Sequence, residues 1–459
     1  MNDQHTDLPA QLTGLISPDA LRAAVKRGEI TTLMLAVPDM QGRAKGKILS
    51  APVFVERMNA EAEMCAYVLA TDVNMTPLGG FDLTGWEQGY GDLGVTADTA
   101  SIRLLPHLPG NALVMGDVFH HDGKPVEVAP RQMLRTQLER LADIGYHVAV
   151  GTEVEFLLYQ GTPQDAHQAG YQGLRPAWPH NLDYALGHPP QAADFFRHLH
   201  DALQDAGIPV EAIKTEGAAG QVEVTFVYGD VMAACDAYTA FKLIVEDLAQ
   251  RHGMTAAFMA APATGVGNGL HLHLSLWSPH GNAFTYHRGD DLPPVMERAI
   301  AGLLSGMPHL APLYAPTPNS YKRYAPYTFA PTRYTWGFDN RGCAVRVTGA
   351  GENAHLEIRL PGADANPYLA LSAACAATIH GLQDHPDLPP PCAGDPYTVA
   401  DVAAVPVDLT EAVRGFDGHK IAHDAFGEGV VRHYARAARA ELDWHRSRVT
   451  DTERQRGIR

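Results

Sequence analysis

Apolar residues recur every three or four positions in several parts of the chain, a spacing that predicts helices with one buried face. In residues 131–145 apolar side chains form such a face, and Gly145 ends it. The same spacing predicts helices over residues 18–29, 192–207 and 236–252. Asn366 and Pro367 predict the start of a further long helix, because Asn is a favoured cap and Pro fits the first helical position.

Shorter apolar or alternating runs predict strands between these helices. Such runs occur over residues 31–37, 147–159, 210–216, 221–227 and 269–277. Residues 54–98 are rich in glycine and turn residues. In residues 101–119 apolar and other residues alternate, and Pro and Gly interrupt the pattern. Roughly the first hundred residues therefore predict a small domain built on a mixed sheet.

The predicted strands carry polar residues at positions i and i+2, where side chains point to the same face. Glu153 and Glu155 form one such pair, and His271 and His273 form another. Two carboxylates about 7 Å apart on one strand face repel each other unless a positive charge lies beside them. Each pair alone is typical of a solvated strand face, but several pairs in one chain indicate a shared site.

A third pair, Glu357 and Arg359, has the same spacing, and Glu216 and Glu223 bracket a glycine-containing connection, GAAGQV. Five Glu with one or two His form a hard-ligand set that suits Mg²⁺ or Mn²⁺, whereas zinc sites are richer in Cys and His. Carboxylate-held metals with nearby arginines are typical of phosphoryl transfer. A metal enzyme that uses the two histidines without ATP is an alternative, but it leaves the arginines unexplained.

The 459 residues include 52 Asp and Glu against 35 Lys and Arg, which gives a net charge of −17. Such a surface repels phosphate backbones, so nucleic acid is not expected as a partner. The five scattered cysteines favour a reducing compartment. The chain has no signal-peptide pattern and no apolar run of about 18 residues, so a cytoplasmic protein without a membrane partner is expected.

Six motifs follow one another in the order found in the glutamine synthetase superfamily. They are GTEVEF, TEGAAGQVEV, FMAAP with GNGLHLHLS, APTPNSYKR, DNRGCAVRV and LEIRLPGADANPYLA. With VPDMQGRAKGK near the N-terminus they cover most of the chain, which resembles the type I-like branch of that superfamily. Within the branch, FAPT, WGFDNR and WEQGYGD are most similar to γ-glutamyl-ethanolamide and γ-glutamyl-polyamine synthetases.

The resemblance implies an α+β fold with two domains. Residues 1–125 would form a small β-grasp-like domain, and residues 126–459 a catalytic domain whose antiparallel sheet forms a funnel-shaped active site. The resemblance also implies a homo-oligomer with active sites between subunits, expected as a dodecamer of two hexameric rings. ATP is the implied co-substrate, with two or three Mg²⁺ or Mn²⁺ ions at each site.

The resemblance assigns roles to individual residues. One metal would be held by Glu155, Glu216 and Glu223. The metal on the nucleotide side would be held by Glu153, His271 and Glu357. Glutamate would be bound by Gly267, Gly269, Arg323 and Arg359. ATP would contact His273, Ser275 and Arg346. The catalytic positions match Arg341, Arg346 and Asp39, with Asp39 supplied by the neighbouring subunit.

The family's reaction has two steps, because ATP first phosphorylates the γ-carboxylate of glutamate and an amine then attacks the γ-glutamyl phosphate. Glutamine synthetases carry a Glu just before the Ala-Pro of a flap, and this chain has Phe329 there. An aromatic ring thus replaces a carboxylate that helps to bind ammonium. The expected acceptor is an organic amine such as ethanolamine, another small amine or a polyamine, in a pocket formed by Phe329 and Asp39.

Two alternatives accompany this prediction. Ordinary glutamine synthetase, with ammonium as the acceptor, is the first, and a catalytically silent scaffold or regulator is the second. The scaffold predicts eroded metal ligands, yet all six positions are intact in chemical type. Three residues depart from the family's pattern near the nucleotide: Ala261, Glu352 and His355.

Overall fold

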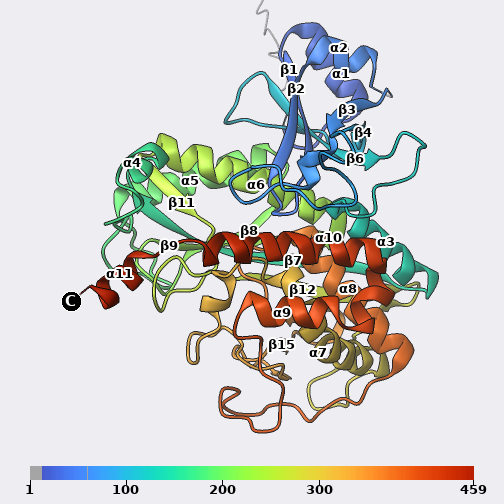
Figure 1. The fold of residues 1–459 in the computed structure, drawn as a ribbon, viewed down its shortest axis with the longest axis vertical. Coiled ribbons are helices and arrows are strands. Elements are labelled where there is room, and N and C mark those ends of the chain that lie inside the picture. The colour runs from blue at the N-terminus through green and yellow to red at the C-terminus, as the bar shows by residue number, and fades with distance from the viewer. Residues whose placement is uncertain (1–12, 59, 459) are drawn as a thin grey trace, which may run out of the picture.

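Two sheets organise the chain in the computed structural model, which describes residues 13–58 and 60–458 (Figure 1). Figure 1 shows the smaller sheet at the top with the N-terminal helices, and the larger sheet below it with most of the helices. The predicted α+β class is confirmed. The boundary after residue 125 and the β-grasp-like character of the first domain stay predictions.

The smaller sheet has six strands in the order β2-β1-β6-β4-β3, with β5 beside β6. Its strands are β1 (Thr32–Pro38), β2 (Ala44–Ser50), β3 (Ala62–Cys65), β4 (Asp92–Ala97), β5 (Arg103–Leu104) and β6 (Asn111–Phe119). β1 pairs with β2 antiparallel and with β6 parallel, so the sheet is mixed, as the sequence predicted. Two helices, α1 (Pro18–Arg27) and α2 (Ala51–Glu56), contribute to its own apolar core.

The larger sheet has ten strands, with β14-β15-β16-β12-β7-β9-β8 as its main path. They are β7 (His147–Gln160), β8 (Val210–Thr215), β9 (Gln221–Phe226), β10 (Gly229–Asp230), β11 (Met254–Ala257), β12 (Leu270–Ser278), β13 (Gly281–Asn282), β14 (Trp336–Phe338), β15 (Val345–Thr348) and β16 (His355–Ile358). The pairing is antiparallel except between β14 and β15, which run parallel. This exception to the expected antiparallel sheet arises because residues 339–344 bring the chain back beside the start of β14.

The other helices belong to the part of the chain that carries the larger sheet. They are α3 (Pro130–Asp143), α4 (Pro163–Gln168), α5 (Pro190–Asp205), α6 (Val231–Arg251), α7 (Pro294–Tyr314), α8 (Pro367–Asp384), α9 (Leu409–Asp417), α10 (Lys420–Arg446) and α11 (Asp451–Gly457). α8 begins as predicted, since the Asn366 side chain accepts a hydrogen bond from the amide of Tyr368. α6 begins five residues earlier than the predicted 236, because Asp230 caps it by accepting from the amide of Ala233.

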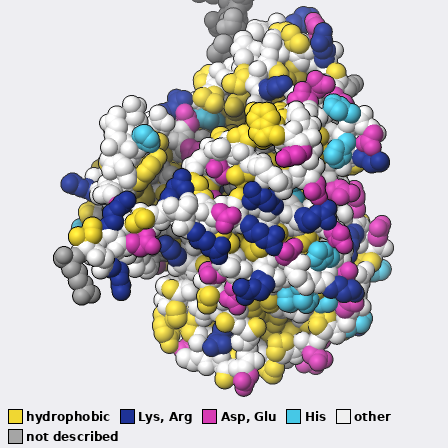
Figure 2. Space-filling model, viewed as in Figure 1, with side chains coloured by type: hydrophobic (Ala, Val, Ile, Leu, Met, Phe, Trp, Pro, Cys, Tyr) yellow, Lys and Arg dark blue, Asp and Glu magenta, His cyan; other side chains and the backbone are white. Residues whose placement is uncertain are grey.

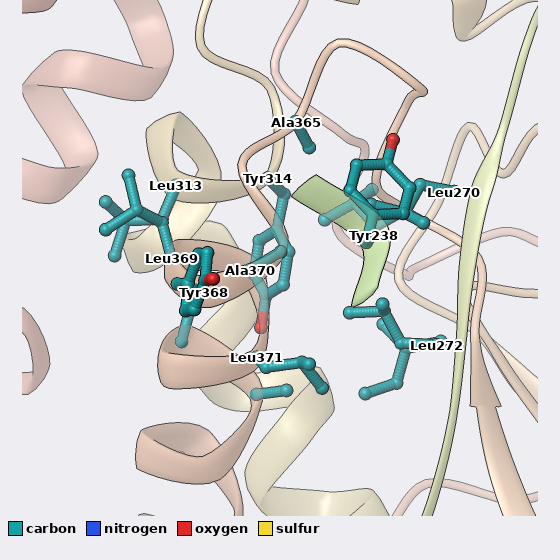
Figure 3. Packing of buried hydrophobic residues seen from close by; sticks show 14 of the residues in the cluster. Tyr238, Leu270, Leu272, Leu313, Tyr314, Ala365, Tyr368, Leu369, Ala370 and Leu371 are labelled. Carbon is teal, nitrogen blue, oxygen red and sulfur yellow. The ribbon is translucent and has the colours of Figure 1, made fainter. Parts of the chain in front are cut away.

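Strand β12 shows how burial orients the polar residues. Its leucines, Leu270 and Leu272 among them, are fully buried. Figure 3 shows both side chains in the core beside Tyr238 and Leu371. Burial of a leucine side chain stabilises the fold by about 1.5–3 kcal/mol, and a one-residue slip would exchange the two faces of the strand. The intervening histidines are therefore fixed on the face opposite this core.

The surface mixes charges of both signs. Figure 2 shows basic side chains interspersed with acidic ones over the middle of this face, across which α10 runs. The net charge of −17 is therefore not gathered into one acidic patch on this face. Within residues 13–58 and 60–458, none of the helices combines the length and the apolar composition that a membrane crossing requires.

Candidate active site

Strand pairing places the predicted metal ligands opposite one another. Glu153 on β7 faces His271 on β12, and Glu155 on β7 faces Glu223 on β9. Residues directly opposed in an antiparallel pair point to the same side of the sheet. The i, i+2 pairs of different strands therefore merge into one polar face, and β16 extends this face by placing Glu357 opposite His273 on β12.

Glu153, His271 and Glu357 form the first cluster, with one potential ligand atom from each lying within 4.8 Å of the others. Nδ1 of His271 lies 3.2 Å from Glu153 and 3.6 Å from Glu357. The other ring nitrogen of His271 is buried and has no hydrogen-bond partner among the described residues. Two carboxylates around an imidazole nitrogen are a donor set that fits a divalent cation.

The charges around the first cluster keep its carboxylates ionised. Burial disfavours the charged form of Glu357, but the Arg359 guanidinium and the neighbouring imidazoles outweigh burial and lower its pKa to about 2. Burial also opposes ionisation of Glu153, yet His271 and His273 lower its pKa. Both carboxylates are therefore negative at neutral pH, as metal ligands must be.

Glu155, Glu216 and Glu223 form the second cluster, again with potential ligand atoms within 4.8 Å of one another. Burial, followed by repulsion from Glu153, raises the pKa of Glu223 to about 9. The crowded carboxylates thus resist full ionisation unless a cation joins them. Lys214 supplies one positive charge, since its ammonium pairs with Glu216 and lies 3.6 Å from Glu223.

Sequence reasoning missed Lys214 and Gln221, two polar residues of this site. The Gln221 side-chain amide donates to the carbonyl of Gly267 at 2.8 Å and to Oδ1 of Asn268 at 2.9 Å. Each missed residue lies two positions before a carboxylate of the second cluster. The i, i+2 rule would have found both if it had been applied to lysine and glutamine as well as to acids and histidines.

The four residues predicted to bind glutamate lie together. Arg323 ends the short helical turn Ser320–Arg323 and is 5% exposed. A Cβ atom at Gly267 would lie 3.0 Å from Cγ of Arg323, and one at Gly269 would lie 2.9 Å from its Nη2. Arg323 also donates to the carbonyl of Arg359 at 3.2 Å. The two glycines thus leave the space that this guanidinium occupies.

The flap approaches the same place through Phe329. Nη2 of Arg359 lies 3.5 Å from the Phe329 carbonyl oxygen. The Phe329 ring is 66% exposed in this chain, so it does not merely pack the flap from inside. Phe329 and Tyr327 have φ values of 59° and 63°, in the left-handed region. That conformation costs an ordinary residue about 1–2 kcal/mol, and such strain concentrates at functional sites.

The residues predicted to contact ATP lie along β12 and the adjoining strands. Nδ1 of His273 lies 3.1 Å from Nε2 of His355, so one of the three departures from the family pattern reaches this face. Burial lowers the pKa of His355, with the backbone of Asn353 partly opposing it. The buried Ser275 hydroxyl accepts from the Trp277 indole at 2.8 Å.

The two arginines at predicted catalytic positions differ in their surroundings. Arg346 donates to Glu357 at 2.9 Å and to Asp339 at 2.8 Å, which joins it to the first cluster. Arg341 is exposed and forms neither a hydrogen bond nor an ion pair with the described residues. It belongs to the turn that precedes β15, so its guanidinium stays available to an anionic ligand.

Asp39 does not join these residues within one chain. It is buried, and its carboxylate pairs with Arg43 at 2.7 Å and lies 3.6 Å from Lys45. It also accepts from the amides of Gln41 and Arg43. Among the described residues, the partners of this carboxylate belong to the same hairpin. A role of Asp39 in a neighbouring subunit's site stays a prediction.

The glutamine synthetase catalytic-domain pattern matches residues 127–457. The chain belongs to the glutamine synthetase family. This membership confirms the predicted family and implies the use of ATP and a divalent metal, for which the two clusters provide suitable ligands. The identity and number of the ions stay predictions.

Two curated relatives of this glutamine synthetase family member match it over nearly their whole length. It is 42% identical to the gamma-glutamylethanolamide synthetase of Streptomyces coelicolor, over 98% of this chain and 97% of the relative. It is 30% identical to the glutamate–isopropylamine ligase of a Pseudomonas species, over 94% and 96%. The solved structure of GmaS with ADP, in conformation 1, matches with a TM-score of 0.82 and 28% identity, over 95% and 98%.

Proposed function

We propose that this protein is an ATP-dependent ligase that joins the γ-carboxyl group of glutamate to an organic amine. Ethanolamine, another small primary amine or a polyamine is the acceptor. One observation carries this proposal: the flap beside Arg359 presents the ring of Phe329 where an ammonium-using enzyme needs a carboxylate. The curated relatives named for ethanolamide and isopropylamide formation support it.

In the first step, a γ-carboxylate oxygen of glutamate attacks the γ-phosphorus of ATP and ADP leaves. Arg323 and Arg359 hold the carboxylates of glutamate, with the carbonyls near Gly267 and Gly269 facing its amino group. His273 and Ser275 contact the nucleotide. Arg341 and Arg346 offset the charge that gathers on the transferring phosphoryl group. Mg²⁺ or Mn²⁺ ions held by the two carboxylate clusters would neutralise the remaining phosphate charge.

In the second step, the neutral amine nitrogen attacks the carbonyl carbon of γ-glutamyl phosphate, and inorganic phosphate leaves. The nitrogen must lose a proton to form the amide, so the site needs an acid-base group near the amine. Asp39 of a neighbouring subunit is our candidate for that group. The ring of Phe329 packs on the methylene groups of the amine.

The same proposal includes a homo-oligomer, arranged as two hexameric rings, that works in the cytoplasm. Phe329 is exposed, and the Asp39 carboxylate contacts residues of its own hairpin and none of the two clusters among the described residues. Both observations support a site completed by a second subunit. The five cysteines are free thiols, which supports a reducing compartment.

An amine panel tests the function directly. Phosphate release is measured with saturating ATP, glutamate and Mg²⁺, while ammonium, ethanolamine, other small amines and polyamines are compared by kcat/KM. We expect an organic amine to exceed ammonium. A higher kcat/KM for ammonium would show that the chain is an ordinary glutamine synthetase.

The Phe329→Glu variant tests the residue on which the acceptor choice rests. A carboxylate there should stabilise a small cation, so the ratio of kcat/KM for ammonium to that for the best organic amine should rise about tenfold or more. Tyr171→Phe, at an exposed aromatic residue of another loop, is the control. An unchanged ratio would mean that the Phe329 ring does not line the acceptor site.

A further inference from the structure

The proline-rich segment that precedes Tyr397 is hydrogen-bonded to β14 and to the turn that follows this strand. The amide of Cys392 donates to the carbonyl of Trp336 at 2.7 Å, and the Trp336 indole donates to the carbonyl of Pro389 at 2.7 Å. The Asn340 side chain donates to the carbonyl of Gly394 at 2.8 Å. Both Trp336 and Asn340 belong to the segment that leads to Arg341. The loop therefore has a fixed position beside the turn that carries Arg341, a predicted catalytic residue.

Tyr397 lies between this turn and the flap. A Cβ atom at Gly342 would lie 3.5 Å from Cε2 of Tyr397, so the ring packs over the turn that contains Arg341. The Tyr397 and Tyr327 rings lie 5.0 Å apart. Two segments far apart in the sequence thus form one aromatic wall beside Phe329.

No side chain of the described residues hydrogen-bonds the buried Tyr397 hydroxyl, which faces the backbone of Phe329 in the flap. Burial raises the pKa of this hydroxyl, while the backbone of Phe329 and the charge of Arg359 act in the opposite direction. The hydroxyl therefore lies close to the flap and to the predicted glutamate clamp. A hydroxyl can both donate and accept hydrogen bonds, so this group keeps capacity for a bond to a polar group of a ligand.

Asp395 adds a carboxylate to the same wall. It accepts from the Tyr327 hydroxyl at 3.3 Å and from the amide of Tyr397 at 2.9 Å, and it remains exposed. Tyr327, which packs on Tyr397 in this wall, and Phe329 both have a left-handed backbone conformation. Aromatic rings around a hydroxyl and a carboxylate suit an amine that has both methylene groups and a second polar end.

We propose that Tyr397 is a specificity-determining residue whose hydroxyl hydrogen-bonds a second polar group on the acceptor amine. The acceptor class is then an amine that carries a hydroxyl or a second amino group, as amino alcohols and diamines do. This inference rests on the proposed glutamate–amine ligase function and names its substrate class. The reactive nitrogen faces the γ-glutamyl phosphate, and the second polar group points to Tyr397.

Three amines of equal length test this inference: ethanolamine, ethylenediamine and propylamine. They differ only in ending with a hydroxyl, an amino or a methyl group. With the wild-type protein, kcat/KM for ethanolamine or ethylenediamine should exceed that for propylamine by about tenfold or more, since a site built for a hydrogen bond rejects the analogue that lacks it. The Tyr397→Phe variant should lose about tenfold of this preference, while its use of propylamine stays within about twofold.

Asp395→Asn separates the two kinds of acceptor. If the second group is an ammonium, this variant lowers the use of ethylenediamine selectively, and if it is a hydroxyl, the use of ethanolamine survives. An equal loss for all three amines in Tyr397→Phe would show a merely structural residue, and an unchanged preference would exclude a contact. Either result overturns this inference and leaves the proposed ligase function standing. ATP turnover by the wild-type protein with ammonium only would overturn the proposed function as well.

Discussion

At the residue scale, the second cluster is shaped by the burial of too many carboxylates. Glu223 is 8% exposed and lies beside other acids, so its charged form is destabilised in the absence of a metal. Lys214 relieves only part of this repulsion, because its ammonium lies nearest to Glu216. A divalent cation held by this cluster would relieve the repulsion, and its binding would displace a proton from Glu223.

The raised pKa of Glu223 predicts how the stability of the metal-free protein depends on pH. Below the ordinary pKa of a carboxyl group, Glu223 is neutral in both the folded and the unfolded chain. Between that value and about 9, only the unfolded chain is ionised, so the free energy of unfolding contributed by this group falls as the pH rises.

Urea unfolding of the metal-free protein at about pH 5 and about pH 8 measures this fall. The Glu223→Gln variant should show a smaller fall because Gln does not titrate. Glu211→Gln, at an exposed position on β8, should behave like the wild type. Equal pH dependence in the wild-type protein and Glu223→Gln would contradict the prediction.

At the element scale, the strand register decides which residues meet. The segment that leads into β12 is held by the Gly269 amide, which donates to Glu155 at 2.7 Å, and by Gln221, which donates to the carbonyl of Gly267 at 2.8 Å. Glycine at position 269 leaves room for two functional side chains. A Cβ there would lie 2.7 Å from Nε2 of His271 and 2.9 Å from Nη2 of Arg323.

Gly269→Ala should therefore fold but displace both side chains, because the new Cβ would meet the ends of side chains and not backbone atoms. We expect kcat/KM for glutamate to fall by about tenfold or more, with a smaller change in thermal stability. Gly79→Ala, where a Cβ would meet nothing within 4 Å, is the matched control. Wild-type steady-state kinetics for Gly269→Ala would show that Arg323 does not bind the substrate.

The contact between α7 and α8 depends on glycine for a different reason. A Cβ at Gly381 would lie 2.7 Å from Cα of Gly302 and would also collide with the backbone carbonyl of Arg298. Backbone atoms cannot move aside as side chains do, so Gly381→Ala should lower the free energy of unfolding by about 1–3 kcal/mol.

Urea unfolding measures this loss, and Gly429→Ala on α10 provides the comparison. A Cβ at Gly429 would meet nothing within 4 Å, so alanine should leave stability unchanged or raise it by about 0.5–1 kcal/mol. Equal stability of the two variants would contradict close packing of α7 on α8.

At the scale of the whole molecule, the two sheets are joined through buried polar contacts. Arg131 on α3 pairs with Asp117 on β6 and with Asp236 on α6. The side chain of Asn366, the cap of α8, donates to the carbonyl of Asp39 at 2.9 Å. The smaller sheet and the hairpin that carries Asp39 are thereby fixed relative to the catalytic part of the same chain.

If Asp39 serves a neighbouring subunit, two inactive variants should complement each other. Asp39→Asn and Glu153→Ala, each inactive alone, are co-expressed with different tags and purified as mixed oligomers. A site formed between subunits should recover about a quarter of wild-type activity, because that share of random interfaces contains both intact residues. The thermal midpoint of Asp39→Asn checks that it folds. No recovery in mixed oligomers would place both residues in one subunit's site.

Much of the fold could be predicted from the sequence, because the spacing of apolar residues and the residues that begin or end a helix are local properties of the chain. The caps and glycines around residues 131–145 and after Asn366 set helix limits, and alternation in 147–159 set the central strand. The start of α6 was misplaced because Asp230 was not recognised as its cap. The parallel pairing of β14 and β15 depends on the path of a turn, which no periodicity shows.

The sequence by itself determined the chemical types of the metal ligands and which of them share a strand face, because side-chain alternation is built into an extended backbone. Only the tertiary structure decided that Glu153 meets His271 and that Lys214 enters the second cluster, because register depends on contacts between distant segments. The tertiary structure also placed Tyr397 beside the flap. That position follows from the packing of a loop on strands about fifty residues earlier, which local sequence patterns do not encode.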